Sequence, residues 1–427
     1  MNIESLENNV YELIKKYFDS ISENHLKPSS WRVPIGGGYY DENEVNAVLK
    51  CYLHGSLSIQ KPVVEFEKAF SSYVGNKHGI ACNSGTSANI LALNTLLESG
   101  DLKVGDEVAV PATTFISVAT PVIQLGLKPV YIDVEPKNYN IDPKELRKAL
   151  PDSNIKCIMA VHTLACPADM PEIMTIAKEH NIKVIEDCCE AHGAIIDGKM
   201  VGSFGDISTW SFYVAHHMTT AEGGMAQTNS EKYNTILREL REFGRNKTYK
   251  GERYGYNSER LADFDERYVF HRIGWNFRMA DAPAAFGLEQ LKKLDEMNSM
   301  RIKNAEYLID NLKPYEKYIQ LPQKGTENFV HTYYSFAILI KEEAGFFRKD
   351  LVHYLESHGI ETRAIMCGTL SDQPSLCNAP GRDYGELKVS RYIRDNGFFV
   401  GCHPGLGKEQ LQHVIKTIGN YILENTK

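Results

Sequence analysis

The chain has 427 residues, of which 43% are hydrophobic and 24% are charged, and its formal net charge is -8 with a sequence pI of about 6.0. This composition is typical of a soluble globular protein that buries a large core, and it excludes disordered, collagen-like and disulfide-scaffold proteins. Because the chain is mildly acidic and has no block of Lys or Arg residues, we do not expect it to bind nucleic acid.

Residues 1–33 are expected to form a helical leader ahead of the main fold. Apolar residues repeat at helical spacing from Leu6 to Phe18, and Pro28 and Pro34 end the pattern. Acidic residues interrupt the segment and it has no apolar h-region, so it does not resemble a signal peptide. With no export signal and no Cys-x-x-Cys spacing, the nine cysteines are expected to be reduced thiols of a cytoplasmic protein.

One uncharged run, residues 108–127, is long enough to span a membrane. It contains Pro111, Pro121 and several threonines, which are unusual in a single apolar helix. We therefore expect this run to fold as a buried strand, a loop and a helix, and we expect no membrane association.

Residues 34–290 are predicted to form a large α/β domain. Short apolar runs alternate there with helical patterns, as in βαβ units whose parallel sheet is covered by helices on both faces. The strand-like runs are residues 79–82, 107–110, 129–134, 157–162, 184–187, 207–212 and 225–228. The helical patterns between them include residues 87–98, 143–149 and 170–180.

Residues 291–427 are predicted to form a smaller C-terminal α+β domain. A long helical pattern over residues 281–311 joins it to the large domain. The segments expected within it are a strand over 332–340 and helices over 347–358 and 408–423.

Two motifs of the large domain could bind an anion or orient a ligand. Residues 83–88 form a small polar turn between a strand and a helix, where free backbone N–H groups suit a phosphate. An ordinary capped helix start is the alternative. Asp187 ends an apolar strand and would face the ligand crevice at the carboxyl edge of a parallel sheet. A solvated strand end is the alternative there.

Two further motifs follow later in the chain. Residues 211–224 run from a strand into a tight turn that carries His216 and His217, and histidine can move protons near neutral pH. Adjacent histidines are also common as packing or surface residues, and neighbours on a strand point to opposite faces, so no metal site is expected. Residues 274–279 by themselves indicate only a loop and a helix start.

In this order and spacing, the four motifs resemble those of the DegT/DnrJ/EryC1/StrS sugar aminotransferases, a family of fold-type I pyridoxal phosphate enzymes, over about residues 34–422. The resemblance implies a mostly parallel central sheet with helices on both faces and a smaller C-terminal α+β domain. It also implies a homodimer with shared active sites.

The resemblance assigns roles by motif to eight residues besides His216. They are Gly85, Thr86 and Ser211 as ligands of the cofactor phosphate, Phe115 as the residue stacked on the pyridine ring, Asp187 as the partner of the pyridinium nitrogen, Asn276 as a contact to the cofactor phosphate of the neighbouring subunit, and His217 and Arg363 as substrate contacts. A carboxylate beside the ring nitrogen keeps it protonated, so that the ring can take up electrons.

His216 occupies the position at which aminotransferases of this family carry the lysine that binds the cofactor covalently. An imidazole has no primary amine for that bond, but it can still take a proton from the C4′ carbon of the cofactor or deliver one. Histidine at this position resembles the 3-dehydratase branch of the family, which uses pyridoxamine phosphate and removes the C3 hydroxyl of a nucleotide-linked 4-keto-6-deoxyhexose.

The resemblance therefore implies a pyridoxamine phosphate-dependent dehydratase of a keto sugar in deoxysugar or surface-polysaccharide synthesis, with glutamate as the expected amino donor. One alternative is an aminotransferase-like enzyme that uses the same cofactor on a different ketone. The other alternative is a non-catalytic subunit that binds the cofactor or a partner.

Part of the 3-dehydratase branch also carries a [2Fe-2S] cluster on a Cys-x57-Cys-x-Cys-x7-Cys pattern. If Cys189 is the first ligand, the other three positions fall on Lys247, Tyr249 and Asn257. Because such a cluster needs four thiolates, we expect no iron–sulfur cluster.

Two positions depart from the family pattern. Asp372 stands where the dehydratases carry an arginine, and its charge would repel a diphosphate if it faced the ligand. Glu190 stands where many aminotransferases carry glutamine, and it is expected either near the phenolic oxygen of the cofactor or at the solvent.

Overall fold

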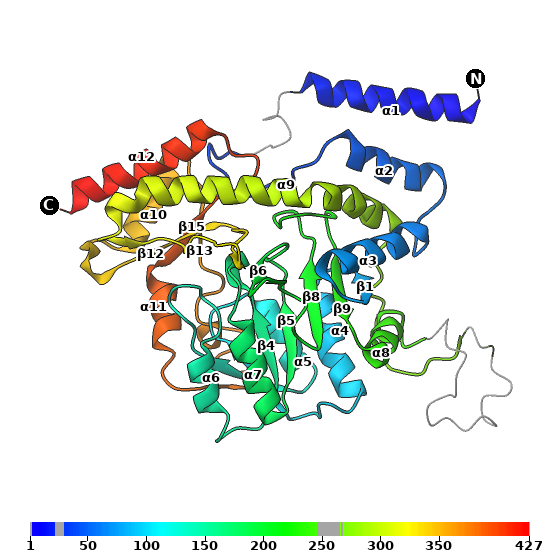
Figure 1. The fold of residues 1–427 in the computed structure, drawn as a ribbon, viewed down its shortest axis with the longest axis horizontal. Coiled ribbons are helices and arrows are strands. Elements are labelled where there is room, and N and C mark those ends of the chain that lie inside the picture. The colour runs from blue at the N-terminus through cyan, green and yellow to red at the C-terminus, as the bar shows by residue number, and fades with distance from the viewer. Residues whose placement is uncertain (1, 22–29, 246–264, 266–267, 427) are drawn as a thin grey trace.

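The computed structural model describes residues 2–21, 30–245, 265 and 268–426, and Figure 1 shows their fold. A large sheet with helices on both faces forms one body, and a smaller sheet with its own helices forms the other. The long helix α9 (Asp281–Leu312) runs along both. Among the described helices, none is both long and apolar enough to cross a membrane.

Eight described strands form the central sheet in the order β1-β9-β8-β5-β4-β2-β3-β14. Strands β8, β5, β4, β2, β3 and β14 pair in parallel, whereas β9 is antiparallel to both of its neighbours. The bounds are β1 (His78–Cys82), β2 (Glu107–Pro111), β3 (Lys128–Ile132), β4 (Ile155–Val161), β5 (Lys183–Asp187), β8 (Ile207–Ser211), β9 (Gly224–Thr228) and β14 (Arg382–Asp383). The mostly parallel sheet is the one that the alternating runs predict.

Both faces of this sheet are buried, which explains why its strands are continuous apolar runs in the sequence. Successive side chains of a strand point to opposite faces. On β2, Val108 and Val110 pack in the core on one face, while Ala109 packs in the core on the other. On β5, Ile185 packs in the core on the first face and Val184 packs in the core on the other.

The helices of the large body lie between its strands in sequence and cover the two faces. One core includes side chains of α4 (Gly85–Glu98) and α8 (Glu231–Arg241), and another includes those of α6 (Pro143–Ala149) and α7 (Met170–His180). The short α5 (Thr120–Gln124) follows β2, so the uncharged run 108–127 is a buried strand, a loop and a helix as expected.

The smaller body contains the antiparallel sheet β10-β12-β15-β13. Its elements are β10 (Ile319–Gln320), β12 (Phe336–Ile340), α10 (Arg348–Ser357), β13 (Thr362–Ala364), α11 (Lys388–Asn396), β15 (Gly397–Val400) and α12 (Lys408–Asn425). The predicted strand over 332–340 begins only at Phe336, because the residues just before it form a loop that reaches a pocket at the edge of the large sheet.

The C-terminal part of the chain does not stay within the smaller body. Strand β14 pairs with β3 at the edge of the large sheet, and Leu370, Leu376 and Leu387 pack in the core of the large body. The residues that line the pocket can therefore come from both bodies. A third sheet consists of the short strands β11 (Phe329–Val330), β6 (Ile195–Ile196) and β7 (Lys199–Met200).

The leader contains the helix α1 (Ile3–Ser20), which contacts α2 (Glu42–Leu53). None of the α1 residues is buried, and Figure 1 shows the helix at the outside of the molecule. Helices α2 and α3 (Lys61–Val74), which were not predicted from the sequence, pack against α9. Val33 pairs with Ile360 and packs in the core of the smaller body, so the end of the predicted leader is part of the fold.

Candidate active site

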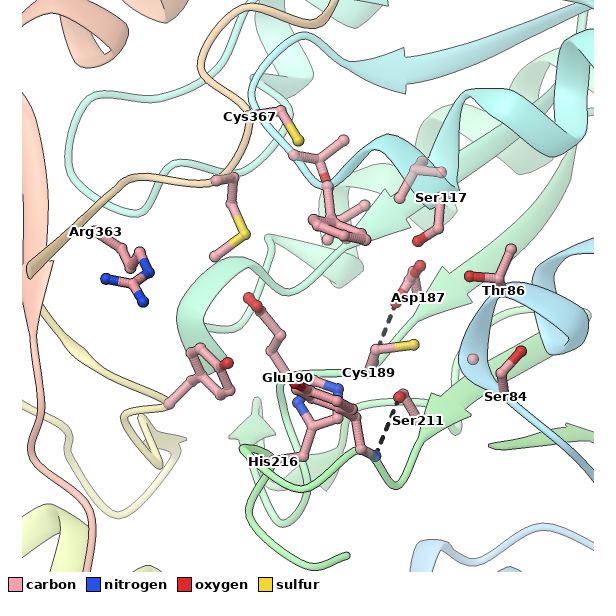
Figure 2. Close-up of a pocket in the computed structure, with 18 of the residues that line it drawn as sticks. Ser84, Thr86, Ser117, Asp187, Cys189, Glu190, Ser211, His216, Arg363 and Cys367 are labelled. Carbon is pink, nitrogen blue, oxygen red and sulfur yellow. Dashed lines mark hydrogen bonds between the residues drawn. The ribbon is translucent and has the colours of Figure 1, made fainter. Parts of the chain in front are cut away.

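A pocket of about 540 Å³ opens at the carboxyl ends of the parallel strands, the edge at which α/β sheets bind ligands. Its wall combines the start of α4, the segments that follow β2 and β5, the turn that follows β8, and residues of the smaller body. In Figure 2, Ser84, Thr86 and Ser211 lie together at one end, Asp187 and His216 lie between, and Arg363 lies at the other end.

The end near Ser84 is shaped for a phosphate. Ser84 caps α4 by accepting a hydrogen bond from the Ser87 N–H, and the helix begins at Gly85. A Cβ atom on Gly85 would lie 2.6 Å from the Ser211 Cβ, so only glycine leaves this approach open. Free N–H groups at a helix N-terminus, next to hydroxyl groups of Thr86 and Ser211, form a cradle that fits the cofactor phosphate.

Asp187 is held rigidly at the end of β5. Its Oδ2 accepts a hydrogen bond of 2.9 Å from the Asn89 side chain, and its Oδ1 accepts one of 3.1 Å from the Cys189 N–H. The Thr209 hydroxyl in turn donates to Asn89 Oδ1. Because these bonds fix its orientation toward the pocket, Asp187 can meet a ring N–H donor. Phe115 lines the pocket with 54% of its surface exposed, so its ring is open to stacking.

A buried group behind β5 supports the same strand end. The side chains of His162, Glu186 and Cys188 lie close enough together to suggest metal ligands. Glu186 already accepts hydrogen bonds from backbone N–H groups at Gly202, Phe204 and Gly205, and His162 Nδ1 accepts one from the Ala168 N–H. His162 Nε2 lies 3.3 Å from Glu186 Oε2, and the Cys188 thiol donates to the Glu186 carbonyl at 3.8 Å. Because its members bond to one another and to the backbone, we interpret the group as structural.

His216 lies in the turn after β8, and its imidazole lines the pocket. Its backbone N–H donates to the Tyr213 carbonyl, and its own carbonyl accepts a bond of 3.3 Å from Arg301 Nη2. Burial of the ring, together with the charge of Arg301, lowers the pKa of His216 to about 3. The imidazole is therefore neutral near physiological pH and can accept a proton.

His217 does not line the pocket, although the resemblance implies that it contacts substrate. It is buried, and its Nε2 donates to the Thr332 carbonyl at 3.3 Å. This bond packs the turn against the loop before β12. The geometry gives His217 a supporting position behind His216.

Several residues near His216 were not identified from the sequence. His192 is buried, with its ring centre 6.2 Å from that of His216, and burial holds the pKa of His192 well below its usual range. The Tyr334 ring lies 5.5 Å from His216 and lines the pocket. Arg301 comes from α9. No local sequence signal marks Tyr334 or Arg301, because they reach the site from distant segments.

Glu190 lies in the pocket wall rather than at the outer surface of the protein. Its Oε2 accepts a hydrogen bond of 2.9 Å from the Leu164 N–H. Burial, with a smaller contribution from the charge of Asp187, raises the pKa of Glu190 to about 8. A carboxyl group with this pKa is largely protonated near neutral pH and can donate a proton.

Three other predicted positions lie at or outside the margin of the pocket. Arg363 lines its far end and forms an ion pair of 2.7 Å with Glu361. Asn276 is exposed and is not in the wall of this pocket. Asp372 is not in the wall either, and forms ion pairs with Arg391 and Arg394.

The three positions aligned with iron–sulfur cysteines, Lys247, Tyr249 and Asn257, lie outside the described residues. The expectation of no cluster stays a prediction from the sequence.

Comparison with known proteins gives a consistent set of similarities. A family model described as the DegT/DnrJ/EryC1/StrS aminotransferase family matches residues 39–419. The lipopolysaccharide biosynthesis protein RfbH of Salmonella typhimurium is 34% identical over 428 residues, which cover 97% of this chain and 98% of that protein. The GDP-perosamine synthase of Caulobacter vibrioides is 32% identical over 393 residues, which cover 92% of this chain and 99% of that protein.

The fold is also similar to that of a solved structure. E. coli GDP-4-keto-6-deoxy-D-mannose-3-dehydratase with bound hydrated PLP superposes with a TM-score of 0.84 at 30% identity, and the match covers 91% of this chain and 100% of that one.

Proposed function

Because the chain belongs to the DegT/DnrJ/EryC1/StrS aminotransferase family, we propose that it is a pyridoxamine phosphate-dependent dehydratase that removes the C3 hydroxyl of a nucleotide-linked 4-keto-6-deoxyhexose. The family resemblance and the fold class expected from the sequence are confirmed, and the protein is a pyridoxal phosphate-dependent enzyme related to aminotransferases. The name of the Salmonella relative supports a place in deoxysugar or surface-polysaccharide synthesis.

One observation carries the choice of a dehydratase over an aminotransferase. His216 occupies the wall of the pocket at the position of the covalent lysine, and the described lining residues include no lysine. Gly85, Thr86, Phe115, Asp187 and Ser211 line the same pocket, which supports a working site over a decayed, non-catalytic one. The pocket is therefore suited to a cofactor that is held without a covalent bond.

The chain offers a contact for each part of the cofactor. Gly85, Thr86 and Ser211 would hold the phosphate at the start of α4, Asp187 would accept the ring N–H, and Phe115 would stack on the ring. When bound, the pyridoxamine form supplies an amine that joins the substrate ketone and a ring that takes up electrons.

His216 supplies the base for the reaction. As a neutral imidazole next to the space for the cofactor, it can take the proton from C4′, while Arg301 fixes the turn through the His216 carbonyl. Arg363, at the far end of the pocket, would meet an anionic part of the substrate. Glutamate would recharge the cofactor with its amine, as the resemblance implies.

We also infer a homodimer in which Asn276 reaches the cofactor phosphate of the neighbouring subunit. The supporting observation is that Asn276 is exposed and takes no part in its own pocket. Its Oδ1 accepts a hydrogen bond from Arg278 Nε, which orients the side chain.

The decisive test follows hydrogen exchange at C4′. Pyridoxamine phosphate is incubated with the protein in deuterated water, and its mass is followed with time. We expect the wild type to exchange one hydrogen, and His216→Asn to exchange it about 10²–10⁴-fold more slowly while binding the cofactor with similar affinity. His180→Asn, on the exposed surface of α7, is the matched control.

Rapid exchange in His216→Asn would show that another group moves this proton. Borohydride treatment gives a second check, because we expect no lysine to carry a pyridoxyl group. A pyridoxyl-lysine on any peptide would contradict the assignment of His216 and favour an ordinary aminotransferase.

A further inference from the structure

Glu190 is an acidic side chain of the pocket to which the proposed reaction has so far assigned no part. Its carboxyl group lies in the pocket wall, between Asp187 and Arg363 in Figure 2. One oxygen, Oε2, accepts the Leu164 N–H, and among the described residues Oε1 has no hydrogen-bond partner. The carboxyl group is therefore fixed at one oxygen and open to a ligand at the other.

The charges around Glu190 do not favour its ionised form. Among the described residues no Lys or Arg forms an ion pair with it, since the one cation in the pocket wall, Arg363, pairs with Glu361. Asp187 lies nearby and accepts two hydrogen bonds, whereas Glu190 accepts one. The other titratable groups of the pocket wall are Cys189, Tyr213, His216, Glu222, Tyr334 and Cys367.

A pair of carboxyl groups in unequal surroundings commonly divides into a charged group and a neutral acid. Asp187 is the charged member of the pair, because it is oriented to accept a hydrogen bond from a positive ring N–H. Burial beside that second carboxyl raises the pKa of Glu190 to about 8, which keeps its proton in place near neutral pH. The pocket thus holds a neutral base, His216, and a neutral acid, Glu190.

We propose that Glu190 is the general acid of the dehydration and gives its proton to the C3 hydroxyl as that group leaves. The proposal rests on the proposed function, because it needs a hydroxyl group as the leaving group. It assigns base and acid to two different side chains of the pocket.

The step balances with these two residues. His216 takes the C4′ proton, and the electron pair of that C–H bond moves toward C3. The C3–O bond breaks with its electrons on oxygen, and Glu190 protonates this oxygen, so that water leaves. C4′ is oxidised by two electrons and C3 is reduced by the same two, so the step needs no outside reductant.

The first readout is the carboxyl proton itself, which is independent of substrate. Infrared difference spectra of the enzyme loaded with pyridoxamine phosphate are recorded between about pH 6 and about pH 10. We expect a protonated-carboxyl band that disappears with a midpoint near 8 and that is absent from Glu190→Gln. Glu289→Gln, whose carboxylate pairs with Lys292 on the surface of α9, is the control and should keep the band.

The second readout separates the acid from the base. Glu190→Gln keeps an oxygen for the Leu164 N–H but has no acidic proton. We expect it to form the deoxygenated product about 10²–10⁴-fold more slowly than the wild type, while C4′ hydrogen exchange by His216 changes by less than about threefold. The wild-type rate should fall above pH 8, where Glu190 loses its proton.

Each contrary result has a distinct meaning. An ionised Glu190 at neutral pH, or an undiminished dehydration rate in Glu190→Gln, overturns the proposal and leaves the proposed function standing. A wild-type enzyme that exchanges C4′ hydrogen but deoxygenates no keto sugar overturns the proposed function, and with it the role of Glu190 as the general acid. Loss of both exchange and dehydration in Glu190→Gln would show a general disruption of the pocket and also overturn the proposal.

Discussion

Gly85→Ala tests the phosphate cradle with the smallest change of volume. The added Cβ would lie 2.6 Å from the Ser211 Cβ and 3.0 Å from the Cys189 Sγ. Carbon atoms pack best at about 3.5–4.0 Å, so the start of α4 or the end of β8 must move by about 1 Å. Overpacking of this kind costs about 1–3 kcal/mol.

The same movement displaces the N–H groups that would bind the phosphate. We therefore expect Gly85→Ala to lower the free energy of unfolding by about 1–3 kcal/mol and to weaken pyridoxamine phosphate binding at least about tenfold. Urea unfolding measures the first effect, and titration of the cofactor absorbance measures the second. Gly407→Ala, at the start of α12, where φ is -86° and an added Cβ would lie 3.9 Å from the nearest atom, is a control for the general effect of replacing a glycine at a helix start.

The double variant Gly85→Ala/Ser211→Gly separates crowding from phosphate binding. Removal of the Ser211 side chain takes away the atoms that the new Cβ would meet first, so stability should recover in part. Cofactor affinity should not recover, because a hydroxyl of the cradle is also lost. If Gly85→Ala alone leaves both unfolding and cofactor affinity unchanged, the reasoning about this cradle is wrong.

Three further outcomes are expected. The pKa of Glu190 is raised to about 8 in the folded state, so the folded protein loses stability when this carboxyl group ionises. As the pH rises from about 5 to above 8, the free energy of unfolding of the wild type should fall relative to that of Glu190→Gln by up to about 4 kcal/mol. A difference in urea unfolding that does not change with pH would contradict this. Asp372→Asn should leave the KM for a nucleotide sugar within about twofold, because the carboxylate pairs with two arginines away from the pocket, and a fall in KM of more than about tenfold would show that its charge reaches the substrate. Protein purified without oxygen should contain no stoichiometric iron by elemental analysis. About two irons per chain would refute the expectation that the chain lacks the cysteine ligands of an iron–sulfur cluster.

The elements that the sequence predicted well are those whose periodicity reflects local burial. The strands of the large sheet are continuous apolar runs because both faces are covered, and α9 was predicted within one residue of its end. The strand before Ile340 was predicted four residues too long, because the buried polar and aromatic residues that precede it belong to a loop. Helices α2 and α3 were missed although α3 has a strongly apolar face.

The residues of the site, too, were predictable where a local motif carries them and not where tertiary packing brings them in. Gly85, Asp187, Ser211 and His216 lie in motifs at the ends of strands, and the structure brings them together at one edge of the sheet. Tyr334, from the loop before β12, could not be found in this way, because tertiary packing rather than local spacing places it there. Burial raises the pKa of Glu190, and burial is a property of the folded pocket.

Arg363 and Asp372 show that a match to a family motif does not by itself place a side chain in the pocket. The sequence suggested that Asp372 could repel an anionic ligand, but the structure places it in ion pairs with arginines of α11. Arg363 lines the pocket as expected. Only the folded arrangement separates the residue in the pocket wall from the residue outside it, and the contact of Arg363 with substrate stays a prediction.

The most direct test of dehydration is the mass of the product. A panel of nucleotide-linked 4-keto-6-deoxyhexoses is incubated with the enzyme, pyridoxamine phosphate and glutamate, and the products are analysed by mass spectrometry, with His216→Asn as the inactive control. We expect a keto sugar that has lost one oxygen atom, formed only by the wild type and in proportion to the glutamate consumed. A product that keeps its other oxygen atoms and carries an amine in place of the ketone would contradict the assignment and identify an aminotransferase.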